Sequence, residues 1–119
     1  MKTKHFIILI ILSISITSCK YGVNITVENN SHELIDSLII RNDFFKVKHL
    51  SLKKNQRFKT FVDFRLDSNK NNDGVFNLTF YSNQNTHIYN NFGYYSNGTP
   101  PSQDLIIKVQ NDSIFVVQK

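Results

Sequence analysis

Apolar and polar residues alternate along most of the chain after its first twenty residues. The clearest alternating stretches are 23–27, 58–66, 76–80, 105–109 and 114–116. Side chains of a strand point to opposite faces in turn, so a period of two is typical of strands with one buried face. We therefore expect strands over these ranges, and no strong amphipathic helix beside them.

Short polar stretches separate the alternating ones. Asn29 to Ser31, Lys53 to Gln56 and Asn111-Asp112 combine residues that favour turns, and Ser82 to Asn85 fits a hairpin into a strand from Thr86 to Tyr95. We expect a turn or hairpin at each of them.

The period is less clear in the second quarter of the chain. The apolar run from Leu34 to Arg41 fits a central strand, with a short helix as the competing interpretation. Val47 and Leu50 then have opposite parities, which would turn the buried side chains to the other face. A bulge or break is expected near Lys48-His49.

The number and spacing of these segments predict the fold class. Seven or eight short strands at spacings near ten residues favour a small antiparallel β-sandwich, either immunoglobulin-like or transthyretin-like. A chain of 119 residues has room for one domain, and no long linker divides it. We place this single domain at residues 23–119.

The N-terminal segment has a different pattern. Lys2 and Lys4 form a basic head, residues 6–16 are apolar apart from Ser13 and Ser15, and the small residues that follow lead to Cys19, the only cysteine. This is the layout of a secretory signal. A membrane-spanning helix needs about 20 apolar residues, so permanent spanning is not expected.

The string Ile16-Thr17-Ser18-Cys19 resembles the lipobox of bacterial lipoproteins. The resemblance implies that residues 1–18 are a signal peptide removed by cleavage, that Cys19 carries covalent lipid, and that residues 19–22 are a short tether. Several acyl chains hold a protein stably on a membrane. The alternatives are an ordinary secretory signal next to a free cysteine, or an uncleaved anchor.

The residue after Cys19 bears on localisation. Many lipoproteins that stay in the inner membrane have Asp directly after the lipidated cysteine, whereas this chain has Lys20 there. The residues that follow also do not resemble the acidic stretch that sends some lipoproteins to the cell surface. We expect a lipid-anchored protein of the bacterial cell envelope, at the outer membrane and facing the periplasm.

The charge of the chain argues against nucleic acid as a partner. The formal charge is +5, and it falls to +3 when Lys2 and Lys4 of the expected signal are left out. Lys53, Lys54 and Arg57 belong to the only local basic concentration, which is typical of a solvated strand edge. No cofactor is expected besides the lipid on Cys19.

Candidate catalytic and metal sites are weak. His32 lacks the second imidazole four residues on that a zinc protease needs, because Asp36 stands there. Asn69, Asn71 and Asp73 are spaced as in a calcium loop, but Phe80 takes the position of the required bidentate Glu. We expect no enzyme and no bound metal, and the calcium loop stays a minor alternative to a turn.

The aromatic segment around residues 89–101 is the best candidate for a binding surface. Its residues Tyr89, Phe92, Tyr94, Tyr95 and Asn97 combine rings with adaptable polar groups, which suit contacts with a protein or a glycan. The alternative is that some of the rings close one end of the core.

Three functions remain open from these observations. The first is a lipid-anchored, non-enzymatic envelope protein that binds a protein or glycan through the segment around residues 89–101. The second is a periplasmic immunity protein that neutralises a toxin. The third is a metal-binding accessory protein or an enzyme.

Overall fold

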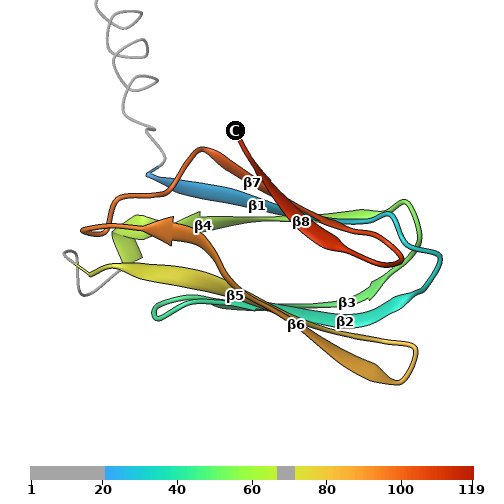
Figure 1. Cartoon of the computed structure of the whole chain (residues 1–119). Coiled ribbons are helices and arrows are strands. Elements are labelled where there is room, and N and C mark those ends of the chain that lie inside the picture. Colours follow the sequence, from blue (N-terminus) through green and yellow to red (C-terminus); the bar gives the residue numbers. More distant parts are fainter. Residues whose placement is uncertain (1–20, 67–71) are drawn as a thin grey trace, which may run out of the picture.

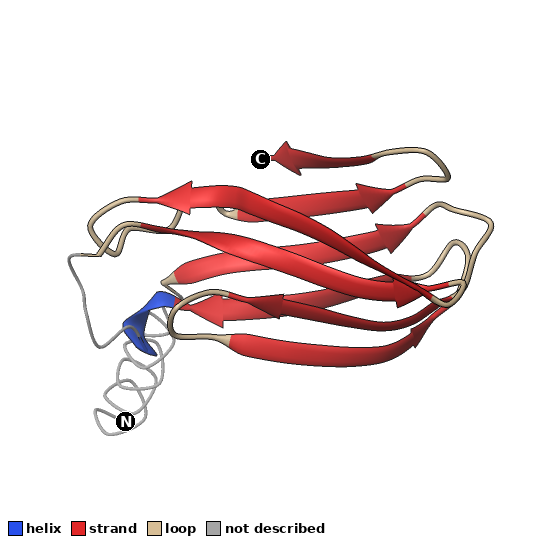
Figure 2. Ribbon diagram, turned by 60° about the horizontal axis from the view of Figure 1, so that its bottom comes forward, coloured by secondary structure: helices blue, strands red, loops and turns tan. Residues whose placement is uncertain are grey.

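The computed structural model describes residues 21–66 and 72–119. In this part of the chain, eight strands form two four-stranded sheets that face each other (Figures 1 and 2). The strands are β1 (Gly22–Asn29), β2 (Ile35–Arg41), β3 (Lys46–Leu52), β4 (Arg57–Asp63), β5 (Gly74–Ser82), β6 (Asn85–Tyr95), β7 (Asp104–Val109) and β8 (Ile114–Gln118). The expected small β-sandwich of seven or eight short strands is confirmed.

The order of the strands in the two sheets distinguishes between the two expected connectivities. The first sheet has the order β4-β1-β7-β8 and the second the order β3-β2-β5-β6. Neighbouring strands are antiparallel except β1 and β7, which are parallel. The immunoglobulin fold keeps its first two strands in one sheet, whereas β1 and β2 lie in opposite sheets here. Of the two expected connectivities, the transthyretin-like one therefore remains.

Alternate residues of the strands fill the space between the sheets. β1 shows the pattern best, because every second residue from Val23 to Asn29 is buried and its neighbours are partly exposed. Fully burying one aliphatic or aromatic side chain stabilises a fold by about 1.5–3 kcal/mol. The fully buried apolar side chains include Val23, Ile25, Val27, Ile40, Val62, Phe76, Leu78, Leu105 and Ile107.

The expected change of buried face occurs in β3, but not at Lys48-His49. Ser51 has a positive φ of 63°, so Leu50 points to solvent while Leu52 is buried. The paired strand β2 changes face at the same level, where its register with β5 shifts between Ile35 and Ser37. The predicted position was wrong because apolar parity alone does not show which of two leucines is exposed.

The stretch predicted as one strand up to Leu66 is divided. β4 ends at Asp63, and Phe64–Leu66 form a short 3₁₀ helix. The amide of Phe64 donates to the carbonyl of Tyr21 at 2.9 Å, and its ring is buried. Within the described residues, no helix has the length and apolarity needed to cross a bilayer.

The two ends of the sandwich differ in what they hold. We call the end where β1 begins the tether end; it carries Tyr21 and the connection between β6 and β7 (Figure 1). We call the opposite end the distal end; it carries the connections β1–β2, β3–β4, β5–β6 and β7–β8 (Figure 1). The distinction matters because the candidate functional groups lie at both ends.

Candidate functional site

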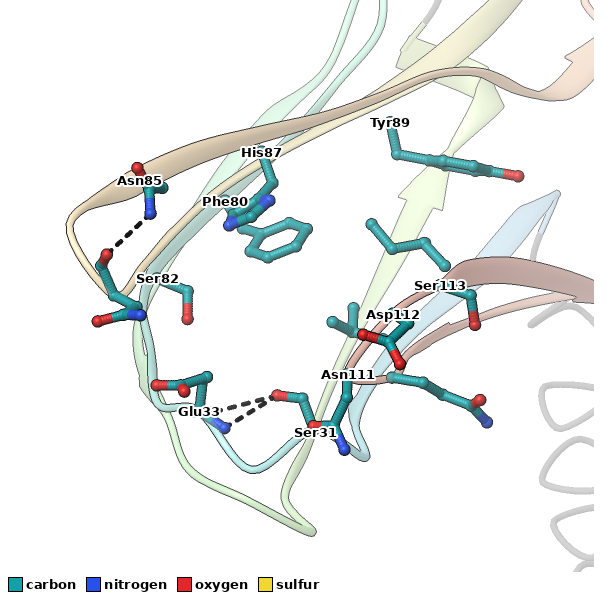
Figure 3. Close-up of a pocket in the computed structure, with 14 residues that line it drawn as sticks. Ser31, Glu33, Phe80, Ser82, Asn85, His87, Tyr89, Asn111, Asp112 and Ser113 are labelled. Atoms are coloured by element: carbon teal, nitrogen blue, oxygen red, sulfur yellow. Dashed lines mark hydrogen bonds between the residues drawn. The ribbon is translucent and has the colours of Figure 1, made fainter.

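A cleft of about 570 Å³ opens at the distal end between the two sheets. This volume lies in the range of small-molecule sites, about 300–1,000 Å³. Figure 3 shows side chains of β5 and β6 on one side of the cleft and those of the β7–β8 connection across from them. The lining residues are Ser31, Glu33, Phe80, Ser82, Asn83, Asn85, His87, Tyr89, Val109, Gln110, Asn111, Asp112, Ser113 and Ile114.

The position of the cleft follows from the strand order. β6 and β8 are the last strands of their sheets on the same side of the sandwich. The β5–β6 hairpin and the β7–β8 turn end as separate projections (Figure 1). The space between them is lined by side chains of both sheets. An edge strand has no neighbour on one side, so this corner of the sandwich stays open.

One side of the cleft is aromatic. The ring of His87 stacks on that of Phe80, with centroids 4.7 Å apart and planes at 15° (Figure 3). Tyr89 is half-buried and its ring lies 5.9 Å from that of the core residue Phe92. Val109 adds apolar surface from the first sheet. Rings held in this way offer flat contact area at low entropy cost.

The rim of the cleft is polar and partly unpartnered. Among the described residues, none hydrogen-bonds to the carboxylates of Glu33 and Asp112 or to the hydroxyl of Tyr89. Asn111 is partly engaged, since its Oδ1 accepts the amide of His32 at 2.8 Å. No Lys or Arg occurs among the described residues that line the cleft. The rim therefore presents acceptors and amides without positive charge.

A buried asparagine fixes the backbone that carries part of the rim. Asn29 is fully buried, and its Nδ2 donates to the carbonyls of Glu33 and Leu52, each at 2.9 Å. Its Oδ1 accepts from the amide of Ser31 at 3.1 Å and from the Ser31 hydroxyl at 2.6 Å. One side chain thus ties β1, the β1–β2 connection and β3 together. The position of Glu33 depends on this network.

The structure divides the predicted aromatic surface. Phe92 and Tyr95 are 5% and 2% exposed, so their rings belong to the core and do not form a contact surface. Tyr95 packs edge-on against Phe44, Phe64 and Phe76, with centroids 5.1–6.1 Å apart. The prediction that these two rings are anchors is corrected, because they close the tether end of the core. Tyr89 lines the cleft instead.

The exposed part of the predicted surface lies at the tether end. Tyr94 is 60% exposed, and its hydroxyl donates to Oδ2 of Asp73 at 3.1 Å. Oδ1 of the same carboxylate accepts the amide of Asn97 at 2.9 Å. Asn97 and Gly98 both have positive φ, as the two central residues of a type I′ turn do. The predicted binding residues are therefore split between the two ends of the molecule.

These contacts lower the pKa of one carboxyl group at the tether end. The pKa of Asp73 is lowered from its ordinary value of 3.8, first by the Asn97 amide and then by the Tyr94 hydroxyl. The same carboxylate raises the pKa of Tyr94. Because the folded pKa of Asp73 is depressed, its contribution to stability is present above pH 3.8 and is lost as the pH falls through the lowered value.

The change Tyr94→Phe tests this network. It removes the second cause of the shift, so we expect the pKa of Asp73 to rise toward 3.8 without reaching it, since the Asn97 amide remains. A titration of the Asp73 carboxyl carbon by NMR measures the effect. Tyr81→Phe is the control, because Tyr81 lies on the outer face of the second sheet. An unchanged pKa in Tyr94→Phe would contradict the assigned contact.

The other predicted ligands are placed only in part. Cys19, Asn69 and Asn71 lie outside the described residues, and Asp73 already accepts hydrogen bonds from two protein groups. No group of three or more His, Cys, Asp or Glu within 21–66 and 72–119 is arranged to hold a metal ion. The ring of His49 stacks on Phe58 at 4.4 Å.

Most of the cleft was missed in the sequence, although a signal for it exists. Asn85, His87 and Tyr89 share one parity in β6 and point between the sheets, whereas Thr86 and Ile88 point outward. A strand with polar and amphipathic residues at its inward positions departs from the apolar pattern of the core. Such a departure at an edge strand indicates an inner surface that solvent reaches.

Comparisons with known proteins show the fold. No model of a protein family matches the chain, and no curated protein matches its sequence. The chain is similar to a protein from Eubacterium rectale solved by NMR, with a TM-score of 0.60 and 12% identity over 87% of this chain and 95% of that one. At this identity, the similarity supports the β-sandwich alone.

Proposed function

We propose that this protein is a lipid-anchored, non-enzymatic binding protein of the bacterial cell envelope, and that it holds a neutral glycan chain in the distal cleft. Cys19 carries the lipid, and the domain faces the periplasm from the outer membrane. The observation that carries the proposal is a cleft of about 570 Å³ that combines aromatic rings with unpartnered polar groups and lacks Lys and Arg among its described lining residues.

The chemistry of the cleft suits a sugar. A pyranose ring has apolar C–H faces and a rim of hydroxyl groups. Tyr89 and the ring of His87, which stacks on the buried Phe80, offer flat surface for the faces. The carboxylates of Glu33 and Asp112 accept hydrogen bonds from hydroxyl groups, and the amides around them both donate and accept.

The charge of the cleft narrows the class of ligand. Glu33 and Asp112 repel anionic groups, and no Lys or Arg among the described lining residues offsets them. Phosphate-bearing and acidic ligands therefore fit poorly, although the chain as a whole is basic. A neutral oligosaccharide meets these conditions.

Two of the serines that line the cleft are hydrogen-bonded within the fold. The Ser82 hydroxyl donates to the carbonyl of Leu34 at 2.8 Å, and the Ser31 hydroxyl donates to Oδ1 of Asn29 at 2.6 Å. A serine nucleophile needs a base as its hydrogen-bond partner. These two hydroxyls serve the fold, so neither of them is placed as an activated serine nucleophile.

Tyr89→Ala tests the proposal. We expect the change to weaken binding of neutral oligosaccharides, measured on a glycan array and by calorimetry, by about fivefold to thirtyfold, because a lost aromatic contact costs on the order of 1–2 kcal/mol. Tyr89 is half-buried, so the thermal midpoint of the variant is measured in parallel.

Tyr81→Ala is the matched control for this experiment. Tyr81 is a partly exposed tyrosine of the adjacent strand β5, but it lies on the outer face of the second sheet, away from the cleft. Its loss should leave binding unchanged. Equal binding by folded Tyr89→Ala and wild type would contradict the proposal, and so would a preference for acidic glycans. Capture of a protein toxin that Tyr89→Ala abolishes would favour the immunity-protein alternative.

A further inference from the structure

The tether end presents two exposed tyrosine rings beside one turn. Tyr21 is 44% exposed, and its hydroxyl donates to the carbonyl of Gly98 at 3.3 Å. Tyr94 is 60% exposed and is linked through Asp73 to the amide of Asn97. Both hydroxyls are therefore fastened to the turn at residues 96–99, while much of each ring stays exposed. Nothing in the proposed cleft uses these rings.

A tyrosine ring with one polar end suits the boundary between lipid and water. Tyr and Trp are enriched at the headgroup level of membranes, because their rings are amphipathic. The headgroup layer on each side of the hydrocarbon core is about 5–7 Å thick. This is about the length of one tyrosine side chain, so a protein surface need not enter the hydrocarbon to place its tyrosines there.

The short segment between Cys19 and Tyr21 would keep these rings close to the membrane. Cys19 precedes Tyr21 by two residues, and two extended residues span at most about 7 Å. Lipid on Cys19 would therefore hold Tyr21 within reach of the headgroup layer. The amide of Gly98 donates to the carbonyl of Asn72 at 3.0 Å, so the turn that both tyrosines contact is itself joined to the start of β5.

The described charges at the tether end do not form a cluster of cations, although Lys20 adds one positive charge between Cys19 and Tyr21 in the sequence. Arg65 and Asp63 form an ion pair of 2.7 Å at the end of β4, next to the strand that Tyr21 precedes. Asp73 adds a negative charge beside Tyr94. Binding to anionic membranes relies on clusters of Lys and Arg. The tyrosine rings are therefore the groups that would meet the bilayer.

We propose that Tyr21 and Tyr94 rest in the headgroup layer of the bilayer that holds the Cys19 lipid, so that the sandwich stands upright on its tether end. β1 then leads away from the membrane, and its eight residues span about 26 Å. The distal cleft faces away from the bilayer. This inference rests on the proposed lipid anchor at Cys19, and it does not depend on the identity of the ligand in the cleft.

Single tryptophan reporters test this orientation. The chain contains no Trp, so Tyr94→Trp and Ile88→Trp each introduce one fluorophore. The two positions match in exposure, at 60% and 63%, but Ile88 lies on the outer face of the second sheet. The full lipidated protein is placed in vesicles of phosphatidylethanolamine and phosphatidylglycerol that contain a lipid with a spin-labelled headgroup.

The expected result is a contrast between the two reporters. The fluorescence of Tyr94→Trp should be quenched at least twofold more by the labelled lipid than that of Ile88→Trp, and iodide in the water should show the opposite order. Halving or doubling the phosphatidylglycerol content should not change the contrast. Thermal midpoints near that of the wild type confirm that both variants fold.

Two results would overturn the inference, and they have different meanings. Equal quenching of both reporters by iodide or by the labelled lipid, in protein that carries labelled palmitate, would show that the anchored domain does not stand on its tyrosines. Palmitate that enters Cys19→Ala as well as wild type would remove the anchor itself. Glycan binding by the cleft is measured separately, so its failure is distinguishable from both.

Discussion

Replacing Tyr95 by Ala should lower the free energy of unfolding by about 3–5 kcal/mol, the usual cost of deleting a large buried aromatic side chain. Tyr95 is 2% exposed, and its ring packs edge-on against Phe44, Phe64 and Phe76. The change would leave a cavity where the second sheet, the β2–β3 connection and the 3₁₀ helix meet. For a domain of this size, such a loss lowers the thermal midpoint by about 15 °C or more.

The neighbouring residue provides the control. Tyr94 is exposed at the surface, and its hydroxyl donates to Oδ2 of Asp73. Tyr94→Ala should cost less than about 1 kcal/mol. Denaturant unfolding of the two variants compares identical chemical changes one residue apart. Similar losses of stability in both would show that the rings are not divided between core and surface as the structure has them.

Asn29→Asp should destabilise the protein by about 3–5 kcal/mol at pH 7, which is the usual cost of leaving a buried charge without a partner. The substitution keeps the size of the side chain but replaces a group that donates to the carbonyls of Glu33 and Leu52, each at 2.9 Å. The introduced carboxylate would face both carbonyl oxygens. The penalty should shrink as the pH falls from 7 toward about 4, because burial raises the pKa of a carboxyl group above its ordinary value of about 3.9, so the folded state takes up the proton first.

The residue next to Asn29 separates burial from charge. Asn30 is exposed, and the contact that the structure shows for it is a backbone hydrogen bond from its amide to the carbonyl of Val109 at 2.8 Å. Asn30→Asp therefore introduces the same charge at the surface and should change stability by less than about 0.5 kcal/mol. Denaturation curves at pH 7 and pH 4 measure both effects. A small loss of stability in Asn29→Asp, or a loss that is equal at pH 7 and pH 4, would refute the assigned role of the buried amide.

Alternation was sufficient to predict the strands, because most of them have one face in the core. It was insufficient where the backbone departs from regular extension. Ser51 has positive φ and changes the buried face of β3, a conformation that nothing in a run of alternating residues indicates. The parallel pairing of Ile25 with Leu105 joins residues far apart in the chain, so local patterns carry no signal for it either.

The aromatic segment shows the same difficulty at the candidate site. In a regular strand Phe92 and Tyr94 would share a face, yet Phe92 and Tyr95 are the buried pair. Asn91 and Gly93 both have positive φ, which breaks the period of two between the rings. A β-carbon on Gly93 would lie 2.6 Å from Cδ1 of Leu105, so the glycine also permits close packing. The composition of this segment was informative, but the direction of each ring was not.

The central place of β1 in its sheet has a mechanical consequence. β1 is paired along its length with β4 on one side and with β7 on the other, and it is the strand that continues directly into the proposed anchor. The hydrogen bonds of such ladders lie across the strand direction, so a pull on the anchored end would load both ladders together in shear. An envelope under tension would therefore be expected to draw the lipid out of the bilayer before it peels this domain open.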